Sequence, residues 1–258
     1  MSTHTTQSAH DEAQTTDILR LEDVTKQFGN VTAVDNLSFS VSEREILGFI
    51  GPNGAGKSTT FDCVSGTMAP TDGEIYYRGE NVTGVPQHAL VEKGIARTYQ
   101  TFRPLNDRTV LENIALSQMP NSLFSFADFR ADTEQRAREI CEQVGLGDVV
   151  DQTPDELPHA GMLRLEIGRA LGTDPDLLLV DEPFAGLTSD EIDRTADLFT
   201  SLREGGMTLV VIDHNMHGLL DLVDRVIVIS FGEKIAEGTP AEIRDDPTVQ
   251  EAYLGGEI

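Results

Sequence analysis

One segment, Gly51-Pro-Asn-Gly-Ala-Gly-Lys-Ser58, restricts the possible folds of this chain more than any other feature. It fits the pattern G-x-x-x-x-G-K-[ST], follows the apolar run Glu45–Ile50 and precedes a helix-type stretch from Ser58 to about Val64. Glycine permits backbone torsions that other residues cannot adopt, so successive N–H groups in such a loop can converge on phosphate oxygens. A strand, this loop and a helix together predict a site for a nucleoside triphosphate.

The loop supplies most of the expected nucleotide contacts. Lys57 would reach the β- and γ-phosphates, and the Ser58 hydroxyl would ligate Mg²⁺. The residues expected to hold the nucleotide are Gly51, Pro52, Asn53, Gly54, Ala55, Gly56, Lys57, Ser58 and Thr59. The chain has no N-K-x-D segment for reading guanine, and its acidic site reads Asp-Glu-Pro-Phe in place of D-x-x-G, so ATP is favoured over GTP.

Short β-type runs alternate with helix-type runs from Ile18 onward, which is typical of an α/β domain. Strands are expected at Ile46–Ile50, Glu74–Arg78, Leu177–Val180, Thr208–Ile212 and Arg225–Ser230. The runs that end at Val180 and Ile212 are apolar nearly throughout, as in strands covered on both faces of a parallel sheet.

Helix-type sequence is prominent in two further regions. Asp190–Arg203 carries an apolar stripe, and Thr188 and Glu191 fit a capping box before it. From about Phe102 to Asp155 the strand signal vanishes while apolar residues repeat at helical spacing. We therefore expect a helical insert in the α/β core.

Charge limits the classes of partner. The 258 residues include 44 acidic and 19 basic (Lys+Arg) side chains, a formal net charge of −25. This charge repels a phosphate backbone and no basic patch offsets it, so nucleic acid is not an expected partner. Acid excess with scarce lysine resembles the surfaces of proteins from high-salt cytoplasm, but an ordinary acidic cytosolic protein fits equally well.

Three features bear on location. Met1–Asp17 is mostly polar and is expected to be a disordered leader without the apolar core of a signal peptide. No run approaches the ~18 apolar residues of a membrane span. Cys63 and Cys141 match no metal-ligand spacing, which favours buried thiols in a reducing compartment. We expect a soluble intracellular protein that could act on a membrane only from its side.

Two carboxylates follow the run Leu177–Val180, where α/β sheets place their ligands. Asp181 would hold Mg²⁺ directly or through water, and Glu182 would polarise the water that attacks the γ-phosphate. His214 follows the next apolar run and could contact the γ-phosphate. His214 and His217 could instead bind a metal, although no convincing third ligand lies nearby.

These elements, in this order, resemble the ATP-binding cassette (ABC) family of transporter ATPases over about Ile18–Ile258. Gly51–Ser58 matches the Walker A motif, Leu177–Asp181 the Walker B motif and Ala185–Thr188 the D-loop. The resemblance implies a P-loop domain with a RecA-like, mostly parallel sheet core, an antiparallel β-subdomain, a helical subdomain at about 102–155 and a C-terminal segment at about 240–258. It implies ATP and Mg²⁺ as cofactors.

The resemblance also implies roles for single residues. Glu182 matches the catalytic glutamate and His214 the switch histidine. Gln100, in Ala-Arg-Thr-Tyr-Gln, matches the Q-loop glutamine that senses Mg²⁺ and the attacking water, and Phe28 lies where the family stacks an aromatic ring on adenine. The implied catalytic residues are Lys57, Gln100, Glu182 and His214, and the implied Mg²⁺ ligands are Ser58, Gln100 and Asp181.

One motif departs from the family. The signature, usually L-S-G-G-Q, falls on Leu157-Pro158-His159-Ala160-Gly161, hereafter the signature segment. In the family it caps the ATP of the opposite subunit with a serine hydroxyl, glycine amides and a helix N-terminus. Here the hydroxyl is missing and a Cβ intrudes at Ala160. We expect the composite site that this segment completes to hydrolyse ATP more slowly than its twin.

Segments outside these motifs resemble the branched-chain amino-acid uptake ATPases. They are Gly94–Gln100, Thr109–Ile114, Leu165–Leu171 and the tail Pro247–Gly255. Urea and short-amide importers share most of these features. The resemblance implies a second cassette (a paralogue or a second copy), two membrane permease subunits, an extracytoplasmic binding protein acting indirectly, and a place on the inner face of the cell membrane. Docking is expected at about Thr101–Ala127 through Phe102, Leu123, Phe124 and Phe126, unless these side chains pack within the insert.

Two other classes stay open. A soluble cassette acting in DNA repair or translation fits poorly, because the chain has one cassette, no heptads and strong negative charge. A regulatory subunit that binds ATP but hardly hydrolyses it fits the altered signature segment, whereas the intact Lys57, Asp181 and Glu182 argue against it.

Overall fold

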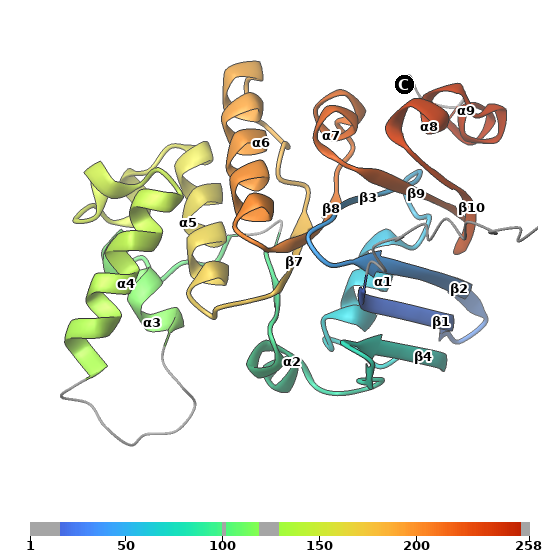
Figure 1. Ribbon diagram of the computed structural model, residues 1–258, viewed down its shortest axis with the longest axis horizontal. Coiled ribbons are helices and arrows are strands. Elements are labelled where there is room, and N and C mark those ends of the chain that lie inside the picture. Colours follow the sequence, from blue (N-terminus) through green and yellow to red (C-terminus); the bar gives the residue numbers. More distant parts are fainter. Residues whose placement is uncertain (1–15, 100–101, 119–128, 254–258) are drawn as a thin grey trace, which may run out of the picture.

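Two β-sheets organise the fold (Figure 1). The protein is represented by a computed structural model that describes residues 16–99, 102–118 and 129–253. Its strands are β1 (Asp17–Phe28), β2 (Val31–Ser42), β3 (Ile46–Ile50), β4 (Asp72–Tyr77), β5 (Glu80–Asn81), β6 (Ile95–Arg97), β7 (Leu177–Asp181), β8 (Thr208–Ile212), β9 (Arg225–Ser230) and β10 (Glu233–Gly238). One sheet is antiparallel in the order β2-β1-β4-β5. The other runs β10-β9-β3-β8-β7-β6 and is parallel except for β10.

Helices flank the parallel sheet and extend beyond one of its edges (Figure 1). They are α1 (Lys57–Val64), α2 (Gln87–Lys93), α3 (Val110–Ser117), α4 (Phe129–Gln143), α5 (His159–Leu171), α6 (Ser189–Glu204), α7 (Met216–Leu222), α8 (Pro240–Asp245) and α9 (Pro247–Tyr253). Short 3-10 turns occur at Gly147–Val149 and Pro154–Glu156. The described residues between 102 and 155 contain α3, α4 and these two turns, and no strand.

The five expected strands are all found, with one correction. The strand expected at Glu74–Arg78 is β4, which ends at Tyr77 because Arg78 takes a left-handed backbone angle, φ 48°. Asp17, expected at the end of the leader, instead pairs with Ser42 as the first residue of β1. Residues 1–15 lie outside the described part of the chain.

Alternation along the buried strands sends side chains into two separate cores. Leu178, Val180, Leu209 and Val211 pack with α5, α6 and α7, whereas Leu177, Leu179, Val210 and Ile212 pack with α1 and the antiparallel sheet. A strand covered on both faces has to be apolar on both, which explains the continuous apolar runs in the sequence. The carboxyl ends of these strands are therefore held in a sheet that is fixed from both sides.

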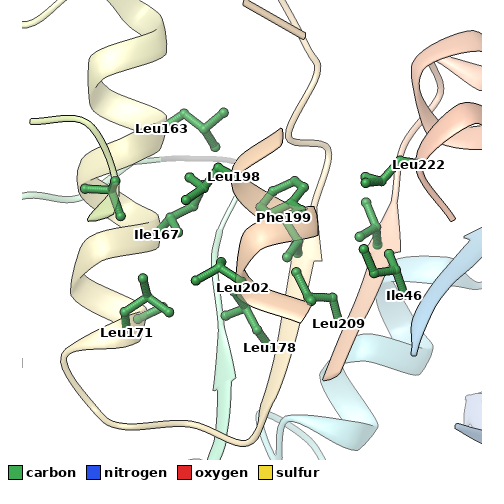
Figure 2. Packing of buried hydrophobic residues seen from close by; sticks show 14 of the residues in the cluster. Ile46, Leu163, Ile167, Leu171, Leu178, Leu198, Phe199, Leu202, Leu209 and Leu222 are labelled. Carbon is green, nitrogen blue, oxygen red and sulfur yellow. The ribbon is translucent and has the colours of Figure 1, made fainter. Parts of the chain in front are cut away.

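Helix α6 closes one face of the sheet (Figure 2). Its start is fixed by the expected capping box, in which the Thr188 N–H donates to Glu191 Oε2 at 2.8 Å. Leu198, Phe199 and Leu202 are buried. In Figure 2, Leu198 lies between α6 and α5, near Ile167, and Leu202 lies near Leu178 of β7. These contacts join α6 to both α5 and the sheet.

Both cysteines are buried, Cys63 in α1 and Cys141 in α4, as expected. Burial raises the pKa of each thiol to about 11. A thiol with so high a pKa is scarcely ionised at neutral pH, so neither is suited to nucleophilic or metal-binding chemistry.

Phe199→Ala is expected to lower the free energy of unfolding by about 3–5 kcal/mol, because the sheet behind Phe199 can refill the cavity only in part. Phe231, which is 92% exposed, offers a matched control. Phe231→Ala is expected to change the free energy of unfolding by no more than about 0.5 kcal/mol. Urea unfolding of the two variants measures both changes, and equal losses would contradict the placement of Phe199.

Candidate functional site

The loop Gly51–Ser58, hereafter the phosphate loop, joins the carboxyl end of β3 to α1. Gly54 and Gly56 have φ angles of 79° and 105°, which L side chains rarely adopt. A Cβ on Gly56 would lie 2.3 Å from the Ala33 carbonyl oxygen in β2, whereas one on Gly54 would meet no atom within 4 Å. The glycine pattern therefore serves two purposes: it permits the turn, and at Gly56 it lets the loop approach β2.

Lys57 is buried at the start of α1, and its ammonium lies against its own loop. Nζ donates hydrogen bonds to the carbonyl oxygens of Gly51 at 2.6 Å and Pro52 at 3.0 Å. Burial lowers the pKa of Lys57, and the negative charges of Glu182 and Asp181 oppose that shift. The side chain is thus a shielded cation between the loop and the two acidic residues.

Segments from distant parts of the chain hold the phosphate loop. The turn between β9 and β10 bonds to it through Gly232, whose N–H donates to the Ala55 carbonyl at 2.9 Å. The Gly232 carbonyl accepts from the Asp35 N–H of β2 at 2.9 Å. In α9, burial raises the pKa of the Tyr253 hydroxyl, and a hydrogen bond from the Gly51 N–H opposes the rise. No motif in the sequence predicts the contact between Tyr253 and Gly51.

The predicted acidic pair lies at the end of β7, beside the end of β8. Glu182 leaves the strand with φ 52°, and its N–H donates to the Ile212 carbonyl at 2.7 Å. His214 Nε2 lies 2.5 Å from Glu182 Oε1. Parallel pairing of β7 with β8, which sets Asp181 opposite Ile212, brings these side chains together. The expected grouping of Asp181, Glu182 and His214 at one sheet edge is therefore present.

Asp213 connects the two chain segments at this edge of the sheet, and it is not among the site residues predicted from the sequence. Its carboxylate is buried and accepts hydrogen bonds from the N–H groups of Phe184 and Asn215, each at 2.7 Å. Burial raises the pKa of Asp213, and these two bonds oppose the rise. Asp213 thus fixes the chain that follows Glu182 to the chain that follows β8. A carboxylate next to the candidate His214 was the available signal.

The signature segment ends at the start of α5, beside the chain that follows Glu182. His159 Nε2 lies 3.0 Å from the Ala185 carbonyl oxygen, and its ring centroid lies 5.4 Å from that of Phe102. Gly161 is buried, and a Cβ there would come within 3.2 Å of the Leu157 side chain. Pro158 is the N-cap residue of α5 and makes no side-chain hydrogen bond to the helix, so it does not replace the hydroxyl of the usual serine.

Phe102 is partly buried and packs against the core, which favours the alternative that it belongs to the interior of the insert. The other apolar residues expected at the docking surface, Leu123, Phe124 and Phe126, lie outside the described residues, as does Gln100. Phe28, expected beside adenine, ends β1 and is 49% exposed, with Lys26 Nζ 5.3 Å from its ring centroid.

Oxygen ligands of the kind that Mg²⁺ prefers lie on both sides of the phosphate loop. Ser58 and Thr59 occupy the first turn of α1, and the Asp181 carboxylate lies at the end of β7. Arg97 contacts Oδ2 of Asp181 at 3.1 Å, which leaves Oδ1 as a candidate ligand. These residues fit the expected magnesium site. The described residues contain no cluster of three His, Cys, Asp or Glu side chains that could hold a metal. The His217 side chain lies outside the described part of the structure, so the alternative metal site at His214 and His217 stays a prediction.

Within the described ranges, no helix combines the length and the apolar character needed to cross a membrane.

Comparison with known proteins gives a consistent result. Residues 34–185 match the family model of the ABC transporter, and residues 233–258 match that of the branched-chain amino acid ATP-binding cassette transporter. The high-affinity branched-chain amino acid transport ATP-binding protein BraF of Pseudomonas aeruginosa is 37% identical over 250 residues, which cover 92% of this chain and 98% of BraF.

Solved structures agree with these matches. MJ1267, an ATP-binding cassette of an ABC transporter in its ADP conformation, has a TM-score of 0.85 and 32% identity, covering 93% of this chain and 99% of that one. The dimeric post-hydrolysis structure of the cassette MJ0796, bound to ADP and Pi, has a TM-score of 0.76 and 26% identity, covering 86% and 98%.

Gly56→Ala is expected to abolish nucleotide binding, because the new Cβ would collide with the Ala33 carbonyl and displace the loop. Gly54→Ala also places alanine at a positive φ, 79°, but with open space around the Cβ, so its cost is expected to be about 1–2 kcal/mol of strain with binding retained. Titration with a fluorescent ATP analogue distinguishes the two variants. Equal loss of binding in both would show that strain, and not the contact with β2, restricts position 56.

Proposed function

This chain belongs to the ATP-binding cassette transporter family, and we propose that it is the ATPase subunit of an importer of branched-chain amino acids. It is an ABC ATPase that hydrolyses ATP for transport. The match of residues 233–258 to the branched-chain model supports the proposed substrate class. We propose a single cassette domain whose helical subdomain lies at about 102–155 and whose C-terminal segment lies at about 240–258.

The observation that carries the proposed mechanism is the contact between His214 and Glu182 beside the phosphate loop. The loop N–H groups and Lys57 bind the phosphates, and Phe28 stacks on adenine. Glu182 orients the attacking water, while His214 holds the Glu182 carboxylate in place and reaches the γ-phosphate. Ser58, Asp181 and Gln100 would hold Mg²⁺, which would supply positive charge at the phosphates.

The proposed partners follow from the family. ABC cassettes dimerise and work with transporter partners. We propose that this chain pairs with a second cassette, either a paralogue or a second copy, and docks on two permease subunits at the inner face of the cell membrane. A binding protein outside the membrane delivers the amino acid. Closure of the two cassettes on ATP drives the permeases, and hydrolysis with product release resets them.

Where the second cassette is a paralogue with the usual signature, the signature segment gives the two nucleotide sites of the dimer unequal chemistry. The site that it completes lacks a serine hydroxyl and meets the Cβ of Ala160, so closure on that nucleotide is weaker. We propose that this site turns over more slowly than its twin. The regulatory alternative, in which the chain hardly hydrolyses ATP, concerns the other nucleotide site. It predicts loss of turnover at the site built on this chain's own Glu182.

The complex reconstituted in vesicles tests the proposed function. ATP hydrolysis is expected to rise when a binding protein loaded with leucine, isoleucine or valine is enclosed, because the loaded protein favours closure. Stimulation by urea or short amides alone would assign the chain to the alternative importer class. Co-purification with ribosomes or DNA, and not with permeases, would support the soluble class.

Glu182→Gln is expected to lower phosphate release by about 10²- to 10⁴-fold, because the amide cannot act as a base toward water. Nucleotide binding is expected to persist, since Lys57 and the loop are unchanged. Phosphate release and binding of a fluorescent ATP analogue measure the two effects separately. Loss of both in a folded variant would mean that Glu182 supports the loop and not the chemistry.

The double substitution Pro158→Ser and Ala160→Gly restores the usual signature chemistry. It is expected to raise turnover of the assembled complex, because the partner's nucleotide regains a hydroxyl donor and loses a steric obstacle. Single-turnover hydrolysis, with Glu182→Gln present to silence the other site, assigns the gain to one composite site. Unchanged turnover would contradict the slow-site proposal.

A further inference from the structure

We propose that Arg97 is a positioning residue for the predicted Mg²⁺ site, because its guanidinium bridges the two elements that carry the Mg²⁺ ligands. The proposal rests on the function proposed above. Arg97 ends β6 and its side chain is only 5% exposed. It contacts Asp62 Oδ1 of α1 at 2.5 Å and Asp181 Oδ2 of β7 at 3.1 Å. A single buried cation therefore connects the helix after the phosphate loop to the strand that bears the acidic pair.

The position of Asp62 makes this bridge relevant to the metal. Asp62 lies four residues after Ser58 on α1, so the two side chains share one face of the helix on successive turns. Fixing Asp62 against Arg97 fixes the height and rotation of α1, and with them the Ser58 hydroxyl. The same guanidinium contacts Asp181 and so fixes the position of the second predicted Mg²⁺ ligand. Arg97 thus determines the separation of Ser58 and Asp181 without contacting the nucleotide.

The hydrogen bonds of the Arg97 guanidinium are concentrated on its two terminal nitrogens, which form the bridge. Its Nε is the single buried side-chain nitrogen or oxygen in the described residues without a hydrogen-bond partner. Buried donors are rarely left unpaired, because water is lost without compensation. Here the two terminal nitrogens both reach carboxylates, and NH1 also donates to Ser65 Oγ at 3.2 Å. The side chain therefore makes both carboxylate contacts while its Nε–H group is left without a hydrogen-bond partner.

Further contacts involve the residues next to Arg97, namely Thr98 and Tyr99, which precede Gln100 in the sequence. The guanidinium carbon lies 5.6 Å from the ring centroid of Phe61 and 5.2 Å from that of Tyr99. Thr98, which follows Arg97, accepts a hydrogen bond from the Asp181 N–H at 3.3 Å. The residues directly before Gln100 are therefore attached to Asp181 at two points. Lysine cannot replace this arrangement, because its single nitrogen cannot span two carboxylates and its charge is not planar.

The test measures the Mg²⁺ dependence of nucleotide binding by the full chain, with a fluorescent ATP analogue and Mg²⁺ titrated from a chelated start. Arg97→Lys and Arg97→Met are expected to raise the Mg²⁺ concentration for half-saturation about 10- to 100-fold, as loss of residues that orient metal ligands does. Binding of the metal-free nucleotide is expected to be unchanged, because the phosphate loop and Lys57 remain. Asp62→Asn weakens only the α1 end of the bridge and is expected to give a smaller shift in the same direction.

Arg203→Lys is the matched control, since Arg203 makes one 2.7 Å ion pair with Asp224, away from the phosphate loop, and is expected to behave as the wild type. Thermal unfolding without nucleotide identifies any variant that fails to fold, and Asp62→Asn then carries the test. A folded Arg97 variant with wild-type Mg²⁺ dependence overturns the Arg97 inference alone. A wild-type chain that does not bind ATP with Mg²⁺ overturns the proposed function and the Arg97 inference with it.

Discussion

The arrangement of the whole site depends on parallel pairing among β3, β8 and β7. These strands are buried on both faces, so their register cannot slip without moving apolar side chains out of two cores at once. Parallel pairing brings all their carboxyl ends to one edge, where the phosphate loop, the Asp181–Glu182 pair and His214 begin. The polar chemistry is therefore positioned by apolar packing that lies behind it, and by α6 in particular.

Much of this could be predicted from the sequence, because the decisive signals are local. The phosphate loop, the five apolar strands and the capping box of α6 each occupy a short continuous segment, and each was found where expected. The expected fold, a mostly parallel core with an antiparallel sheet and helices, is confirmed as that of an ABC ATPase. Strands β1 and β2 cannot be predicted individually from the sequence, since β-bulges in their pairing interrupt the alternation of buried and exposed residues that marks a strand.

Other parts of the site could not be predicted, because they depend on contacts between residues far apart in the sequence. Arg97 meets Asp181 across two neighbouring strands, and His159 meets Ala185 where α5 begins. Arg97 and His159 both lie in segments that resemble the family, but the resemblance does not indicate either contact, and Asp213 is not among the site residues that the sequence predicts. The sequence does not predict whether Phe102 is exposed or buried, because periodicity in the insert does not indicate which apolar side chain faces the core.

The contact between Tyr253 and Gly51 has a consequence for how the chain matures. On the ribosome the phosphate loop emerges early, long before β7, β8, β9 and the helix that carries Tyr253. Until those later segments are made, the loop lacks the strands beside β3, the Gly232 turn and the tyrosine hydroxyl. Folding of the nucleotide site is thus a late event of synthesis, and a nascent chain can bind nucleotide in the native manner only after nearly all of its sequence has left the ribosome.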